Sequence, residues 1–142
     1  DEDAVHALTI TNTINHSHAN YRACGTCWPY DDSPYSSYTY HPDFDDGGYP
    51  YTSPVGYFAP NGYGVYDAAG NVWEWCNDWY SSSYYSSSPG SNPTGPGSGT
   101  QRVLRGGGWG SLAVYCRAAS RLWGMPGVGG SSAGFRCALG TP

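Results

Sequence analysis

Residues 61–80 read NGYGVYDAAGNVWEWCNDWY. Trp73 and Trp75 alternate with Glu74, and this period of two predicts a short strand with one aromatic face. Glycines lie just upstream, Gly70 among them, and glycine permits tight turns or a positive φ. The sequence therefore predicts a turn-rich segment that leads into an aromatic strand.

The same residues place oxygen atoms close together along the chain. They are the carboxylates of Asp67 and Glu74 and the backbone carbonyls near Gly70 and Val72. Hard cations such as calcium take oxygen ligands, so the cluster is a candidate calcium site. On spacing alone a simpler interpretation is favoured, in which acids beside glycines cap the turn and face water.

Length and composition limit the function classes. At 142 residues the chain has the size of one domain. The net charge is −5 and the six basic residues are all arginine, so the composition disfavours a nucleic-acid or anionic-membrane binder. The apolar runs are far shorter than the roughly 20 residues that span a bilayer, so membrane insertion is not expected. The 21 glycines and 14 tyrosines predict loops around an aromatic core, and the start at Asp1 is interpreted as a mature or trimmed N-terminus.

Five cysteines favour an oxidising, extracellular compartment, and their odd number leaves one thiol unpaired or paired outside the chain. Cys24 and Cys27 have the spacing of half a zinc site, but the sequence has no second such pair, so zinc is disfavoured. Asn15-His-Ser17 is a glycosylation sequon, usable in a host that glycosylates.

Along the rest of the chain, short strands are expected between long loops. The strands are predicted at residues 5–10, 102–105 and 115–121, with residues 134–139 closing the chain. Residues 28–53 are predicted to be a long ordered loop packed by its tyrosines. Residues 81–100, rich in Ser, Pro and Gly, are predicted to be a surface loop.

Four motifs occur in a fixed order: PNGYGVYDAAGNVWEWC (60–76), RVLRGGGW (102–109), CRAASR (116–121) and GFRC (134–137). Together they resemble the formylglycine-generating enzyme (sulfatase-modifying factor) family, and Asn20-Tyr21 and residues 52–55 extend the match upstream. The resemblance implies an α+β, loop-rich, variant C-type-lectin-like fold with short antiparallel strands, few helices and bound calcium. The family's N-terminal segment has no counterpart here, so residues 1–142 are interpreted as one domain that resembles the C-terminal part of the family domain.

The resemblance also favours calcium in the oxygen cluster and adds a second site. The first family site falls on Asp67, Gly70, Val72 and Glu74. The second falls on Asn20, the carbonyl of Tyr21, Asp46 (with Asp45 as the alternative) and the carbonyl near Tyr49.

The same resemblance argues against catalysis by this chain. Family enzymes that oxidise a substrate cysteine use two cysteines five residues apart, which bind copper through thiolates, and thiolates suit that soft metal. These positions fall on Ser111 and Cys116, and a serine hydroxyl does not replace a thiolate. The alternative role for Cys116 is a disulfide with Cys76, in which case Cys137 pairs with Cys24 or Cys27.

Two non-enzymatic functions from different classes remain. One is a secreted structural or assembly module that self-associates into a homo-oligomer or filament. The other is a lectin-like variable module that binds a protein or glycan ligand; a formylglycine-generating oxidase is the third alternative. The assembly module and the ligand-binding module would both use large apolar side chains between the motifs at 102–109 and 134–137, because exposed apolar patches usually mark contact surfaces. The alternative is that these side chains complete the core. These residues are Leu112, Val114, Tyr115, Leu122, Trp123 and Met125.

Overall fold

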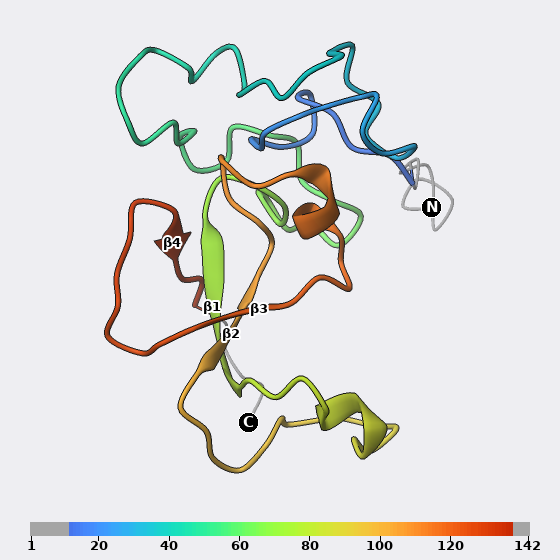
Figure 1. Cartoon of the computed structure of the whole chain (residues 1–142), viewed down its shortest axis with the longest axis vertical. Helices are drawn as coiled ribbons and strands as arrows, with labels where there is room; N and C mark the ends of the chain where they lie inside the picture. The colour runs from blue at the N-terminus through green and yellow to red at the C-terminus, as the bar shows by residue number, and fades with distance from the viewer. Residues whose placement is uncertain (1–11, 138–142) are drawn as a thin grey trace.

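The computed structural model describes residues 12–137. The strand expected at residues 5–10 lies outside this range. Figure 1 shows the loops of the N-terminal half at one end of the long axis, a small sheet below them, and the serine-rich loop at the other end. Within residues 12–137, no helix is long and apolar enough to cross a membrane.

The sheet has four short strands in the order β3-β2-β1-β4. Their bounds are β1 (Trp73–Trp79), β2 (Arg102–Arg105), β3 (Leu122–Gly124) and β4 (Ala133–Gly134). β1 runs antiparallel to β2, where Trp75 pairs with Leu104, and β2 runs antiparallel to β3. β4 runs parallel to β1, so the sheet is mixed where only antiparallel strands were expected. The loop-rich class with few helices is confirmed.

Strand positions agree with the sequence pattern for β1 and β2 but not for residues 115–121. That segment instead holds the end of η3 (Ala113–Cys116), a 3₁₀ helix, followed by a turn that leads into β3. The reason is a spacing of three: Ala113 and Cys116 face inward, whereas Tyr115 between them is exposed. Of the described part of the closing segment, residues 134–137, only Gly134 falls in a strand.

The long loop 28–53 is ordered by buried contacts, as predicted. The carboxylate of Asp31 is buried and accepts hydrogen bonds from the Tyr21 hydroxyl (2.6 Å) and the Cys24 backbone N–H (2.7 Å). Tyr30 and Tyr35 of this loop pack against the core cluster, and the ring centroid of the buried Tyr51 lies 5.3 Å from that of Trp109. Aromatic area thus replaces regular secondary structure in this half.

The serine-rich loop 81–100 lies on the surface, as predicted. It contains one further 3₁₀ helix, η2 (Tyr84–Ser86), which buries none of its residues.

Candidate functional site

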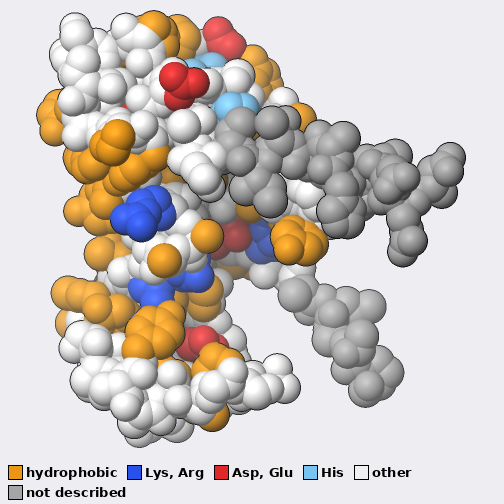
Figure 2. All heavy atoms as spheres, turned by 90° about the vertical axis from the view of Figure 1, so that its right-hand side faces the viewer, with side chains coloured by type: hydrophobic (Ala, Val, Ile, Leu, Met, Phe, Trp, Pro, Cys, Tyr) orange, Lys and Arg blue, Asp and Glu red, His pale blue; other side chains and the backbone are white. Residues whose placement is uncertain are grey.

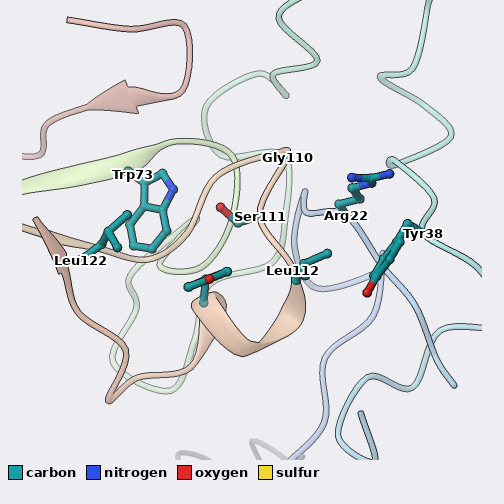
Figure 3. Close-up of a pocket in the computed structure, with 8 residues that line it drawn as sticks. Arg22, Tyr38, Trp73, Gly110, Ser111, Leu112 and Leu122 are labelled. Atoms are coloured by element: carbon teal, nitrogen blue, oxygen red, sulfur yellow. The ribbon is translucent and has the colours of Figure 1, made fainter. Parts of the chain in front are cut away.

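A cavity of about 440 Å³ opens beside η3, and we call it the Ser111 groove. Its lining comes from the N-terminal loops, from β1 and from the segment between β2 and β3. The lining residues are Arg22, Tyr38, Trp73, Gly110, Ser111, Leu112, Tyr115 and Leu122. Figure 3 shows Trp73 and Leu122 on one side, Arg22 and Tyr38 on the other, and Ser111 between them.

Backbone hydrogen bonds fix the middle of the groove. The Arg22 N–H donates to the Ser111 carbonyl at 2.8 Å, and Arg22 forms a parallel bridge with Leu112. The Ser111 hydroxyl accepts a hydrogen bond from the Gly108 N–H at 2.9 Å. The hydroxyl therefore closes its own turn, and the loop that carries it is tied to the N-terminal half.

Arg22 forms the cationic end of the groove. Its guanidinium carbon lies 5.0 Å from the ring centroid of Tyr38 and 5.2 Å from that of Tyr40, within the range of cation–π contact. The Nε of Arg22 is buried and has no hydrogen-bond partner. The groove therefore combines an apolar end with a cationic end that has unused hydrogen-bonding capacity.

Cys116 lies in different surroundings from Ser111. It lines a separate cavity of about 700 Å³, together with residues of the first loop such as Ile14 and Ala19. Its sulfur packs against Gly107, where φ is +78° and an added Cβ would lie 2.9 Å from Sγ. Burial raises the pKa of the Cys116 thiol to about 12, so the thiol stays protonated at neutral pH.

The predicted disulfides are wrong. The bridge that forms joins Cys24 to Cys27, whose Cα atoms lie 5.4 Å apart on one turn, within the usual range for a disulfide. Cys76, Cys116 and Cys137 are free.

Cys76 and Cys116 lie in different surroundings. Cys116 faces the backbones of Gly70 and Gly107. Cys76 instead lies among charged groups that include Arg105 and Asp78, and burial raises the pKa of its thiol.

Four of the six predicted surface residues are exposed. Tyr115 is 41% exposed, Leu122 37%, Trp123 47% and Met125 57%, so these side chains do not complete the core. Leu112 and Val114 are half-buried. In Figure 2, hydrophobic and arginine side chains lie intermingled along one side of the molecule, between the upper loops and the serine-rich loop.

Two residues of the first predicted calcium site, Asp67 and Glu74, contact Arg136. The Glu74 carboxylate pairs with the Arg136 guanidinium at 2.6 Å, and the same guanidinium donates to the Asp67 carbonyl at 3.2 Å. The hydrogen bond to the Glu74 carboxylate raises the pKa of the Arg136 guanidinium, and burial of the group acts in the opposite direction. Asp67 Oδ2 accepts a hydrogen bond from the Gly56 N–H at 2.5 Å, whereas Asp67 Oδ1 is buried without a partner.

The second predicted site is less closely assembled. Asn20 is 1% exposed; its Nδ2 donates to the Tyr51 carbonyl at 2.7 Å, and its Oδ1 is buried without a partner. The Tyr21 carbonyl already accepts a hydrogen bond from His16. Asp46 is exposed and accepts from the Gly48 N–H. In the described part of the chain, no three His, Cys, Asp or Glu residues are grouped as they would be around a metal ion.

Sequence reasoning missed two arginines of these sites. Arg22 follows the Asn20-Tyr21 motif directly, but its role depends on the bridge to Leu112, which no local pattern reveals. Arg136 belongs to the GFRC motif, but the sequence did not reveal that it pairs with Glu74.

Comparison with known proteins identifies the scaffold. Residues 16–140 match the family model of the sulfatase-modifying factor enzyme 1-like domain. A formylglycine-generating enzyme from Streptomyces coelicolor is 46% identical over 101 residues, which are 69% of this chain and 32% of that protein. The chain thus spans about a third of the length of this relative.

Two solved structures resemble the fold. One is PvdO from Pseudomonas aeruginosa, with a TM-score of 0.59 and 28% identity over 84% of this chain and 38% of that chain. The other is Treponema denticola variable protein 1, with a TM-score of 0.52 and 40% identity over 65% of this chain and 33% of that chain. These similarities agree with the variant lectin-like fold that the motifs imply, and the chain belongs to the sulfatase-modifying factor (formylglycine-generating enzyme) domain family.

Proposed function

We propose that this chain is a non-catalytic interaction module on the formylglycine-generating-enzyme scaffold. One observation carries the proposal: Ser111 and Cys116, at the positions of the family's two thiols, line different cavities. Copper-dependent oxidation of a substrate cysteine needs two thiolates that meet at one soft metal. Here one position is a hydroxyl bonded to its own turn and the other is a half-buried thiol whose raised pKa keeps it protonated.

A peptide oxidation assay tests the absence of catalysis. The chain is incubated with a cysteine-containing sulfatase peptide, copper and oxygen, and the peptide is analysed by mass spectrometry. We expect the peptide to keep its thiol, with the S. coelicolor enzyme as the positive control. Conversion of the peptide cysteine to the aldehyde by this chain would overturn the proposal.

The exposed apolar residues at the edge of the sheet support self-association. β3 is an edge strand, and its Trp123 and the following Met125 are exposed. Unpaired strand edges recruit partner strands, and lysines, which commonly protect such edges, are absent from this sequence. A second copy of the chain is therefore the proposed partner. The Cys24–Cys27 disulfide supports an extracellular location for the assembly.

Ligand binding is the second candidate function, and the Ser111 groove favours it. The groove has the volume of a small-molecule site and combines apolar walls with few polar groups. The similarity to Treponema denticola variable protein 1 supports a variable-module scaffold for this function.

Calcium is the proposed structural ion. Asp67 Oδ1 is a buried carboxylate oxygen without a partner, which suits a hard cation, and Glu74 would share its carboxylate between the ion and Arg136. The carbonyls of Gly70 and Val72 would complete this site. The unpartnered Oδ1 of Asn20 supports the second site. Calcium would stabilise the turn that leads into β1.

A further inference from the structure

The cationic end of the Ser111 groove has a charge that forms no ion pair with a carboxylate of the described residues. Within residues 12–137 the ion pair that forms joins Arg136 to Glu74, and Arg22 takes part in none. The Nε of Arg22 is also buried and makes no hydrogen bond. A buried charged donor without a partner is unfavourable, because the protein must offset its lost hydration.

The surroundings of Arg22 hold its side chain in place. Its backbone is bonded to Ser111, and its guanidinium carbon lies over the rings of Tyr38 and Tyr40. Contacts of this kind use the face of the planar guanidinium, so its N–H edge stays free of them. Because the Nε is buried, a ligand in the groove would meet the two terminal nitrogens, which are not among the buried atoms. A carboxylate matches that edge with two parallel hydrogen bonds.

The opposite end of the groove accepts an apolar group. Trp73 and Leu122 lie on that side in Figure 3, with Leu112 between them and Arg22. Tyr115 adds a further aromatic ring, whose centroid lies 5.9 Å from that of Trp73. An occupant that satisfies both ends carries a negative charge at one end and an apolar body at the other.

We propose that the Ser111 groove binds an organic acid in which a carboxylate is joined to an apolar or aromatic body, with Arg22 binding the carboxylate. The proposal rests on the ligand-binding function above and names its ligand class. The same chemistry is present in a free aromatic acid and at the C-terminus of a peptide that ends in an apolar residue.

The test compares two probes of the same shape and different charge, 3-phenylpropionate and 3-phenylpropionamide, by isothermal titration calorimetry and NMR. We expect the wild-type chain to bind the acid about tenfold more tightly than the amide or better, as a charge-assisted bidentate pair would give. Arg22→Gln should abolish this preference.

Arg117→Gln is the matched control. Arg117 also lies over a tyrosine, with its guanidinium carbon 5.5 Å from the ring centroid of Tyr30, but it lines the other cavity. The Arg117→Gln variant loses the same charge as Arg22→Gln and should keep the preference for the acid. Arg22→Lys retains the charge without the planar fork and should show a reduced preference. Melting curves of each variant confirm that it is folded.

The outcomes that contradict the proposal distinguish the carboxylate preference from ligand binding in general. Equal binding of acid and amide, weakened for both by Leu122→Ala, would overturn the carboxylate preference and leave the ligand-binding function standing. Binding of neither probe at millimolar concentration would overturn both. N-acetyl-glycyl-phenylalanine and its amide distinguish the sources: a preference for the free peptide acid extends the site to peptide C-termini, and a preference with phenylpropionate alone restricts it to free acids.

Discussion

At the scale of single residues, the candidate sites are marked by buried polar atoms without partners. Asp67 Oδ1, Asn20 Oδ1 and Arg22 Nε are all of this kind. Such atoms are rare in native proteins, and each calls for an explanation such as an ion or ligand. The two oxygens suit a cation and the guanidinium suits an anion, so the two kinds of site differ in the charge that they attract.

Calcium should raise the melting temperature of the wild-type chain. A ligand that binds only the folded state adds about 2.7 kcal/mol of stability at 100 times its Kd. Asp67→Ala should abolish the calcium-dependent rise, because it removes a carboxylate ligand. The measurement is differential scanning fluorimetry with calcium and with chelator. The exposed carboxylate of Asp32 provides the control, since Asp32→Ala should keep the full response.

If the wild-type chain melts at the same temperature with calcium and with chelator, the proposed calcium site is wrong.

His16 should make the fold less stable as the pH falls below about 6.5. Its ring is half-buried, hydrogen-bonded through Nε2 to the Tyr21 carbonyl, and 4.7 Å from the His41 ring. Burial lowers its pKa, and His41 adds to this; the hydrogen bond to Tyr21 and the carboxylates of Asp31 and Asp43 act in the opposite direction. The unfolded chain therefore binds more protons below pH 6.5, so stability is full above that pH and lost below it.

Urea unfolding between pH 7.5 and 5 measures this effect. His16→Gln keeps a donor for the Tyr21 carbonyl and removes the titrating group, so its free energy of unfolding should depend less on pH than that of the wild type. An equal pH dependence of the two proteins would show that His16 is not responsible.

At the scale of elements, the sequence predicted the strands whose residues follow a local apolar pattern. The alternation at Trp73 and Trp75 and the apolar pair in 102–105 identified β1 and β2, because cross-strand packing selects these residues. η3 was missed because a spacing of three over four residues is too short to stand out. The Cys24–Cys27 disulfide is local, but its spacing was interpreted only as half a zinc site. The groove depends on contacts between distant segments, which the sequence does not show.

Gly107→Ala should destabilise the connection between β2 and η3 by about 1–3 kcal/mol. Its φ is +78°, and the added Cβ would lie 2.9 Å from the Cys116 sulfur. Cys116→Ala in the same chain should recover the part of the loss that is due to the clash. The control is Gly110→Ala, where an added Cβ has no atom within 4 Å. Urea unfolding checks the series, and equal stability of the two glycine variants would contradict this account.

At the scale of the whole molecule, the sheet edge at β3 is one of the places where the fold exposes large apolar side chains. The four-stranded sheet ends at β3, and the serine-rich loop and the tyrosine-rich loops lie at opposite ends of the long axis (Figure 1). Burial of apolar surface contributes about 25 cal/mol per Å², and a standard interface buries roughly 1,600 Å² in total. Self-association would bury part of this exposed apolar surface, and the contacts that it forms must outweigh the freedom lost on association.

Sedimentation velocity over a range of micromolar concentrations tests the interaction-module account most directly. The account predicts a species heavier than the 15.2 kDa monomer that grows with concentration. Trp123→Ser should shift it toward the monomer, while Tyr63→Ser, which removes an aromatic ring that is 93% exposed elsewhere on the surface, should leave it unchanged. A 15.2 kDa monomer at every concentration, unaffected by either substitution, would contradict self-association.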